Sequence, residues 1–288
     1  MRHLRPVAVI AALAALAACQ DTGTGVRPAE PSASVQPEGY PGAPAPRTGW
    51  IIGQGGKPME IVYSVHEGNA IWEGDIDLGP AEWISATPME ALRRKDGPRL
   101  GVAIDGSTYR WPSAVVPYVI PSGFPSPSRI TNAIAHIEAN TVDVDFVVRT
   151  NQSNYIQFRT STGCSSNVGR IGGRQYVNLA SGCSTGNTIH ELLHALGMFH
   201  EHTRCDRDTY VTINSQNILS GYSGNFTKQC TNATDYGSYA EGSIMHYPPT
   251  AFSSNGQPTI VSKRGLDHLM GQRTAMNSTD ISTINTLY

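Results

Sequence analysis

The sequence predicts an α+β protein, and three observations support this class. Short apolar runs typical of strands occur beside segments whose apolar residues recur at helical spacing, and the two kinds do not strictly alternate. An apolar content of 39% and a charged content of 15% are typical of a globular protein with a sizeable core. A length of 288 residues indicates one or two domains.

The expected elements lie after Leu100, where the pattern becomes that of a folded domain. A helix is predicted to begin at Ser126-Pro127, with serine as its cap and proline at its first helical position, and to end near Asn140. Its apolar residues recur at helical spacing: Ile130, Ala133, Ile134 and Ile137. A second helix is expected over residues 188–196, and strands over residues 115–120, 143–149, 155–159 and 175–179. The rest is mostly loop.

Residues 1–18 have the composition of a signal peptide. Two arginines precede an apolar run over residues 7–18, which is too short to anchor the chain across a membrane. The run ends in Leu16-Ala17-Ala18-Cys19, which resembles the cleavage box of bacterial lipoproteins. That resemblance implies a lipidated Cys19 and attachment to the cell envelope. Cleavage at another alanine-rich site, with Cys19 incidental, is the alternative, and export is expected in both cases.

Three segments follow the signal peptide. Residues 19–49 are rich in small residues and proline without apolar periodicity, so they are expected to form a flexible tether. Residues 50–100 contain short apolar groups, too few for an independent core, and are expected to lie against another part of the chain. Residues 101–288 form the expected folded domain. The net charge of −2 argues against nucleic acid as a partner.

The chain has four cysteines besides Cys19. In an oxidising compartment they are expected to form disulfides, whereas in the cytosol they would suggest metal ligation. The sequence alone leaves three connectivities open.

The strongest motif lies in the second predicted helix and the turn after it. It reads His190-Glu191-Leu192-Leu193-His194-Ala195-Leu196-Gly197-Met198-Phe199-His200-Glu201. His190 and His194 are four residues apart, so both imidazoles project from one face of a helix and can share one ion. Gly197 can adopt the left-handed conformation that ends the helix, which allows His200 to return as a third ligand. Three neutral imidazoles with one open position are the pattern of a catalytic zinc site.

The open position determines the expected chemistry. Zinc lowers the pKa of a bound water to about 7. Glu191 is the candidate general base for that water, and afterwards the acid that protonates the leaving amine. A chance cluster of histidines is rejected because six fixed positions coincide. An intact metal site on an inactive protein remains an alternative.

The flanking residues narrow the class further. The motif extends the zinc-binding pattern of metzincins, and two flanking segments closely resemble the astacin family of zinc metalloendopeptidases. The first is His200-Glu201-His202-Thr203-Arg204 followed by Asp206-Arg207-Asp208, and the second is Ser243-Ile244-Met245-His246-Tyr247. The similarity extends from about Trp111 to Tyr288. It implies a metzincin-type catalytic domain, with a twisted mixed sheet, two main helices above a zinc cleft and a loop-rich C-terminal subdomain.

The resemblance also implies roles for individual residues. Met245 would form the apolar floor beneath the zinc. Tyr247 would ligate zinc in the resting mature enzyme and then swing away to hydrogen-bond the developing oxyanion. Glu201 would receive the buried amino terminus of the processed chain, which falls near residue 101 or 102. His202 and His246 match no family ligand and are assigned to packing or to the surface.

A second resemblance lies in Ile71-Trp72-Glu73-Gly74-Asp75-Ile76. In astacin propeptides an aromatic residue and any one residue precede Gly-Asp, and the aspartate binds zinc in place of the water, at about 2.0–2.2 Å. The resemblance implies that residues 50–100 are a propeptide in which Asp75 keeps the precursor latent. An ordinary Gly-Asp surface turn is the alternative.

The cysteines can also be compared with the family. Cys164 and Cys183 match one of its disulfides. The other family disulfide lacks both partners here, so Cys205 and Cys230 are expected to pair with each other, which departs from the common pattern. Each bridge would close a loop of roughly 20–25 residues and contribute on the order of 3 kcal/mol.

The sequence therefore predicts an exported zinc metalloendopeptidase, made as a latent proenzyme of bacterial type. Its expected partners are protein or peptide substrates, bound by strand addition along an edge strand near residues 175–179, and an activating protease that cuts within residues 93–102. The precursor is also expected to bind the membrane through Cys19, and activation would release the enzyme. The alternatives are another metzincin branch and a catalytically inactive surface binding protein of metzincin fold.

Overall fold

The computed structural model describes residues 44–53, 56–94 and 109–288, and all of them belong to one compact unit. The expected signal peptide, Cys19 and most of the expected tether and processing region lie outside the described residues. None of the described helices combines the length and apolar character needed to cross a membrane.

The secondary structure of the described residues mixes helices and strands. The helices are α1 (Pro88–Arg93), α2 (Ser128–Asn140), α3 (Thr185–Ala195) and α4 (Ser278–Leu287). The strands are β1 (Arg47–Ile52), β2 (Pro58–His66), β3 (Asn69–Trp72), β4 (Ile76–Pro80), β5 (Val115–Val119), β6 (Asp145–Val148), β7 (Tyr155–Thr160), β8 (Ser165–Ser166), β9 (Arg174–Leu179), β10 (Val211–Ile213) and β11 (Ile260–Ser262). The predicted α+β class is confirmed.

Nine of these strands form one mixed sheet in the order β1-β2-β3-β4-β8-β9-β7-β5-β6. Strands β1 to β4 are antiparallel to one another, and β9, β7, β5 and β6 are parallel. The short strand β8 lies antiparallel to β9 and parallel to β4. Strand β8 therefore connects the antiparallel half of the sheet to the parallel half.

The two halves of the sheet come from two parts of the chain. Strands β1 to β4 and helix α1 belong to residues 44–94, here called the prosegment after the propeptide expected from the sequence. The remaining elements belong to residues 109–288, here called the main domain. Strand β1 starts at Arg47, within the expected tether. Buried residues of both parts, such as Ile51 and Trp72 with Leu192 and Met245, share one hydrophobic cluster. Burial of apolar surface therefore holds the prosegment on the main domain.

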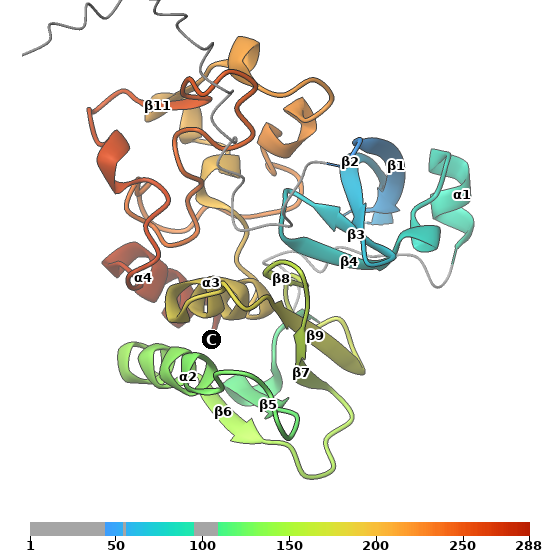
Figure 1. Ribbon diagram of the computed structural model, residues 1–288, viewed down its shortest axis with the longest axis vertical. Helices are drawn as coiled ribbons and strands as arrows, with labels where there is room; N and C mark the ends of the chain where they lie inside the picture. The colour runs from blue at the N-terminus through green and yellow to red at the C-terminus, as the bar shows by residue number, and fades with distance from the viewer. Residues whose placement is uncertain (1–43, 54–55, 95–108) are drawn as a thin grey trace, which may run out of the picture. The chain divides into compact units, whose positions relative to one another are not determined.

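Helices α2 and α3 lie side by side (Figure 1). The apolar residues of α2 are buried at helical spacing, as predicted. The expected cap was wrong, because α2 begins at Ser128, and no side chain caps it. Helix α3 begins three residues earlier than expected, because Ser184 and Asn187 form a capping box in which each side chain bonds the other's backbone N–H.

The second half of the main domain consists mostly of loops around strands β10 and β11 and helix α4 (Figure 1). Its loops share a second hydrophobic cluster built largely from aromatic residues, including Tyr222, Phe226, Tyr239, Tyr247 and Phe252. This arrangement agrees with the loop-rich C-terminal subdomain expected from the sequence.

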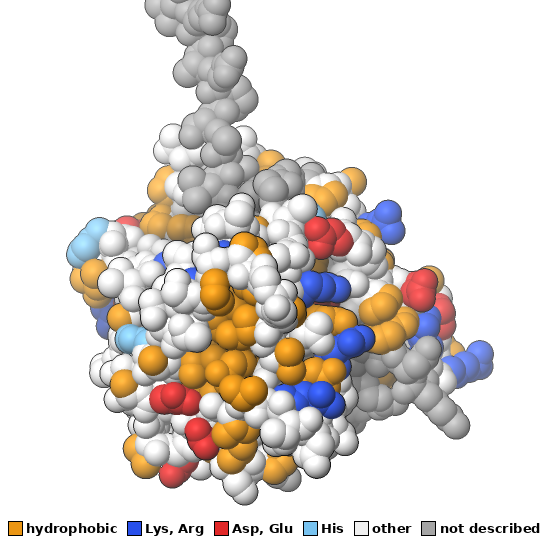
Figure 2. Space-filling model, turned by 60° about the horizontal axis from the view of Figure 1, so that its bottom comes forward, with side chains coloured by type: hydrophobic (Ala, Val, Ile, Leu, Met, Phe, Trp, Pro, Cys, Tyr) orange, Lys and Arg blue, Asp and Glu red, His pale blue; other side chains and the backbone are white. Residues whose placement is uncertain are grey.

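The face that comes forward from the bottom of Figure 1 carries hydrophobic side chains near its middle, with basic side chains to one side (Figure 2). Val142 and Val148, before and at the end of β6, are the most exposed large hydrophobic residues of the described chain, at 79% and 69%. Single exposed apolar residues are normal on soluble proteins and indicate no particular partner.

Candidate metal centre and active site

Helix α3 and the turn after it bring three imidazoles together. His190 and His194 lie on one face of the helix and are completely buried. Gly197 has φ = 112°, and the N–H of Met198 donates to the carbonyl of Leu193, so the helix ends as its sequence predicts. The chain then turns back and places His200 beside the other two, with ring centroids 5.4 Å from His190 and 4.7 Å from His194.

The prosegment adds a carboxylate to these imidazoles. Asp75, in the turn between β3 and β4, is completely buried. Its oxygens lie 3.3 Å from Nε2 of His190, 3.6 Å from Nε2 of His194 and 3.1 Å from Nε2 of His200. The structure thus brings together the four residues that the sequence predicts as metal ligands of the precursor.

The spacing of these groups fits a zinc ion. Four ligand atoms at zinc distances of about 2.0–2.2 Å in a tetrahedron lie roughly 3.3–3.6 Å from one another. The ligand atoms found here all lie within 4.8 Å of one another. Oδ1 of Asp75 and Nε2 of His194 are buried and have no hydrogen-bond partner among the described residues, as expected of atoms that bind an ion.

The other ring nitrogens are also held. Nδ1 of His190 bonds the carbonyl of Ile244 at 2.8 Å, and Nδ1 of His194 bonds the carbonyl of Met198 at 2.7 Å. Nδ1 of His200 lies 2.9 Å from the carboxylate of Glu73. All three partners are acceptors, so each Nδ1 carries the proton and each Nε2 is free to bind a metal.

Glu191 lies in the same buried region and has no hydrogen-bond partner among the described residues. Both of its carboxylate oxygens are buried and make no hydrogen bond to a described residue. Burial, together with the negative charges of Asp75 and Asp77, raises the pKa of Glu191 well above its ordinary value. A carboxylate with no structural partner beside a metal centre is suited to proton transfer.

The turn over residues 243–247 lies against the metal-binding helix. Met245 is completely buried in the main hydrophobic cluster, and its carbonyl accepts the N–H of Glu201. Asp280 of α4 holds the start of this turn, because its carboxylate accepts the hydroxyl of Ser243 and the N–H of Ile244. Asp280 is therefore connected to His190 through the backbone N–H and C=O of Ile244.

Tyr247 is completely buried between two imidazoles. Its ring stacks on His202, with centroids 3.8 Å apart, and its centroid lies 4.6 Å from that of His200. Its hydroxyl donates a hydrogen bond to the carbonyl of Glu73, so in this structure the hydroxyl is engaged by the prosegment. His202 and His246 are buried and bond the carbonyls of Asn225 and Tyr247. They belong to packing rather than to the surface.

Glu201 is buried next to a small cavity. Its carboxylate accepts the N–H of Ala240 at 2.9 Å and lies 3.7 Å from Nε of Arg204. Burial raises the pKa of Glu201 to about 8. The adjoining cavity has a volume of about 50 Å³ and is also lined by Asp235 and Tyr236.

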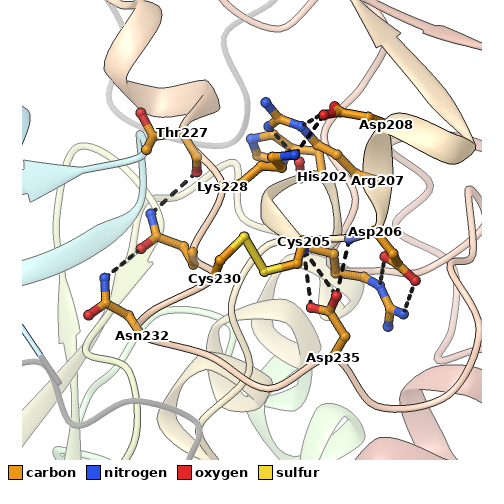
Figure 3. The surroundings of a disulfide bond; sticks show 12 residues. His202, Cys205, Asp206, Arg207, Asp208, Thr227, Lys228, Cys230, Asn232 and Asp235 are labelled. Carbon is orange, nitrogen blue, oxygen red and sulfur yellow. Dashed lines mark hydrogen bonds and ion pairs between the residues drawn. A yellow bond between two sulfur atoms is a disulfide. The ribbon is translucent and has the colours of Figure 1, made fainter. Parts of the chain in front are cut away.

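The structure joins Cys164 to Cys183 and Cys205 to Cys230, which are the pairings expected from the sequence. Figure 3 shows the second bridge with Asp235, whose carboxylate accepts the backbone N–H of both Cys205 and Asp206. The bridge and Asp235 thus fix the loop that follows the third histidine.

Three residues of the site are not predicted by the sequence. Glu73 stands where the resemblance allows any residue, Gln229 lies in a loop without a motif, and Asp280 lies in the last helix. The carboxylate of Glu73, close to Asp75 in sequence, was the available signal. The other two residues depend on contacts between distant parts of the chain.

The geometry of the site defines a metallopeptidase domain of metzincin type. It combines two histidines four apart on a helix, a third histidine after a glycine turn, a buried glutamate and a buried methionine turn. The family Astacin (Peptidase family M12A) matches residues 103–288. The chain therefore belongs to the astacin family. The zinc cofactor and the metzincin-type fold predicted from the sequence are confirmed.

Individual relatives agree with this assignment. Zinc metalloproteinase nas-13 of Caenorhabditis elegans is 41% identical over 206 residues, covering 67% of this chain and 45% of that protein. Zinc metalloproteinase nas-4 of the same organism is 40% identical over 186 residues, covering 62% of this chain and 59% of that protein. The chain thus spans about half the length of these two curated relatives.

A solved structure supports the fold. High choriolytic enzyme 1, a hatching enzyme zinc-protease from the medaka fish Oryzias latipes, is 38% identical to this chain, with a TM-score of 0.58. The likeness covers 63% of this chain and 95% of that one.

Proposed function

We propose that this chain is a zinc-dependent endopeptidase that is made as a latent proenzyme. The observation that carries the proposal is the convergence of three Nε2 atoms beside the buried, unpartnered carboxylate of Glu191. Membership in the astacin family supports the same chemistry, because the relatives carry the name zinc metalloproteinase. Protein or peptide substrates follow from the peptidase class.

The residues of the main domain divide the catalytic work. His190, His194 and His200 would hold zinc, which when bound supplies a water of pKa about 7 and a Lewis acid for the substrate carbonyl. Glu191 takes the proton of the attacking water and passes it to the leaving amine. The hydroxyl of Tyr247, once separated from the prosegment, would be free to donate to the developing oxyanion, and in the resting enzyme it would be one of the groups that hold the metal.

Latency follows from the position of Asp75. Its carboxylate fills the fourth corner of the donor set, which is the position that the catalytic water needs. Trp72, the aromatic residue of the same motif, packs edge to face on Phe199 with ring centroids 6.0 Å apart, which supports a fixed position for the turn.

Substrate binding is proposed at strand β8 rather than at residues 175–179. The expectation of an edge strand at residues 175–179 was wrong, because β9 is paired on both sides, with β7 and with β8. In the main domain β8 is the last strand of the sheet, and β4 of the prosegment covers its free side. Removal of the prosegment would expose β8 to an extended peptide by strand addition.

Processing within residues 93–102 by another protease would complete activation. Arg93 is the last residue of α1, and residues 95–108 lie outside the described residues. The boundaries at residues 18 and 100 are kept as expected from the sequence, whereas the tether ends before residue 49, because β1 begins at Arg47. The cavity beside Glu201 supports this residue as the acceptor of the new amino terminus, since it offers space for a second positive group besides Arg204 next to this buried carboxylate.

Export is proposed from residues 1–19, with Cys19 as the lipid attachment site of a bacterial-type precursor held at the cell envelope. The two disulfides support an oxidising compartment. The relatives compared above are animal proteins and give no support to the bacterial type, which rests on the leader sequence alone.

Replacing Glu191 by glutamine tests the proposed activity. Loss of the general base is expected to reduce peptide hydrolysis by the processed protein by about 10²–10⁴-fold, while the three imidazoles still hold the metal. Hydrolysis of a diverse peptide library and metal content by elemental analysis measure the two properties, and a chelator should stop hydrolysis by the unmodified protein.

Equal activity of Glu191→Gln and the unmodified protein would refute the proposed mechanism. Absence of hydrolysis in both, with metal bound, would instead favour the catalytically inactive binding protein of metzincin fold.

A further inference from the structure

Glu73 is buried in the metal centre beside Asp75, although it does not face the metal ligands' Nε2 atoms. It is completely buried, and its two carboxylate oxygens have different partners. One lies 2.9 Å from Nδ1 of His200, and the other accepts Nε2 of Gln229 at 2.9 Å. A buried carboxylate is costly to place unless both oxygens are satisfied, so these contacts amount to specific recognition.

The groups that bond the carboxylate of Glu73 belong to the main domain, and Gln229 among them is held in place. Gln229 is 3% exposed, and its backbone N–H donates to the carbonyl of Thr203 at 2.8 Å. Its side-chain oxygen accepts Nδ2 of Asn232 at 3.1 Å, which turns its amide nitrogen toward Glu73. The disulfide between Cys205 and Cys230 ties together the two segments that carry Thr203 and Gln229.

The backbone of Glu73 is also adapted to this position. Glu73 has φ = 48° and Gly74 has φ = 81°, so two successive residues adopt the left-handed region. That region is unfavourable for a side chain such as glutamate, and it persists only where the surroundings enforce it. The turn places the carboxylates of Glu73 and Asp75 on the same imidazole, that of His200, at Nδ1 and Nε2 respectively.

We propose that Gln229 and Nδ1 of His200 form a carboxylate-binding subsite that recognises Glu73. The prosegment is then held at the metal centre by two carboxylates, one at the fourth corner and one at this subsite. The inference rests on the proposed function, because it describes how the same site is kept latent. A prosegment with an apolar residue at position 73 would leave Nδ1 of His200 without this acceptor and Nε2 of Gln229 with only the carbonyl of Thr227, at 3.4 Å, among the described residues.

Hydrogen exchange of the full-length precursor tests the subsite independently of activity. Glu73→Gln keeps the size of the side chain but turns an amide nitrogen toward that of Gln229, so the amides of β3 and β4 are expected to exchange about 10- to 100-fold faster. Gln229→Ala should have a similar effect with Glu73 intact. Glu67→Gln is the matched control, because Glu67 also bonds the main domain, at Ser161 and Thr162, but is exposed.

The double variant in which the residues at positions 73 and 229 are swapped gives the sharpest test. In Glu73→Gln/Gln229→Glu the new amide donates to the new carboxylate and its oxygen can still accept Nδ1 of His200, so the amides of β3 and β4 should return to within about 3-fold of the unmodified precursor. No recovery in this double variant, or an effect of Glu73→Gln no larger than that of Glu67→Gln, would overturn the subsite.

Hydrolysis separates this inference from the proposed function. Peptide cleavage by the unprocessed Glu73→Gln precursor should rise at least about 10-fold, and processing should bring it to the level of the processed unmodified protein, because position 73 has been removed. If the exchange rates follow the prediction but the protein never hydrolyses peptides, the proposed function is refuted and the subsite is still supported.

Discussion

The prosegment and the main domain hold the three imidazoles of the metal centre in different ways. His190 and His194 bond the backbone carbonyls of Ile244 and Met198, which belong to the main domain. His200 bonds Glu73, which belongs to the prosegment. Two of the rings are therefore oriented by the domain that keeps them, and the third by a segment that processing would remove.

This difference indicates where the prosegment can influence the metal centre. Partners of the second ring nitrogen fix the orientation and the tautomer of a metal-binding histidine, and their loss typically lowers metal affinity or activity by about 10–100-fold. A backbone carbonyl is present in every state of the folded domain, whereas a side chain of the prosegment would be present only in the proposed precursor. The third histidine would thus be the ligand whose surroundings change most on the proposed activation.

Replacing Asp75 by alanine gives the largest expected effect and tests the prosegment side of the comparison. Without this carboxylate the fourth corner is open to water, so the unprocessed precursor should hydrolyse peptides at least about 100-fold faster than the unmodified precursor. A peptide assay on precursor with an intact chain, verified by mass spectrometry, measures the change. Glu60→Ala, which removes an exposed carboxylate of β2, is the control.

Persistent latency of the Asp75→Ala precursor would show that the contacts of Glu73 and β4 are sufficient to block the site. In that case Asp75 would contribute less to latency than the contacts of Glu73 and β4.

Removing the disulfide between Cys205 and Cys230 has the next largest effect and tests the loop that presents Gln229. The bridge closes 25 residues, so its replacement by two serines should lower the free energy of unfolding by about 3 kcal/mol. Urea denaturation measures this loss. Replacing Cys164 and Cys183, which are separated by 19 residues, should cost a similar amount.

The two disulfide variants should nevertheless differ in one respect. Only loss of the bridge at Cys205 is expected to speed proteolytic release of the prosegment, because only that bridge lies beside the contact between Gln229 and Thr203. Equal release from both variants would contradict a special role for this loop.

The features of the site that the sequence predicted correctly depend on local geometry. The spacing of His190 and His194, and the position of Gly197, determine which way the side chains point and where the helix ends, and no distant contact is needed for either. Helix α2 was predictable for the same reason, since its buried residues follow one face. Its first turn was not, because Ser126 adopts φ = 50° and lies outside the helix.

The features that the sequence did not predict depend on contacts between distant residues. Strand β8 has two serines and no apolar run, so nothing in its composition marks it as a strand, and β9 was taken for the edge. Glu73 lies 127 residues before His200 and 156 residues before Gln229 along the chain, and only the fold brings them together. Helical or strand periodicity carries no information about such contacts.

Asp280→Asn is the smallest of the expected effects and tests the main-domain side of the comparison. The carboxylate accepts the hydroxyl of Ser243 and the N–H groups of Ile244 and Asn277, so an amide nitrogen in place of one oxygen would face donors. The free energy of unfolding should fall by about 1–3 kcal/mol, against no measurable change for Ser282→Ala on the exposed face of the same helix. Because Ile244 also orients His190, zinc should leave the variant faster, which a chromogenic chelator would measure. Lower stability with unchanged zinc release would mean that the carbonyl of Ile244 keeps its place without Asp280, and that the main domain holds its two imidazoles through the backbone alone.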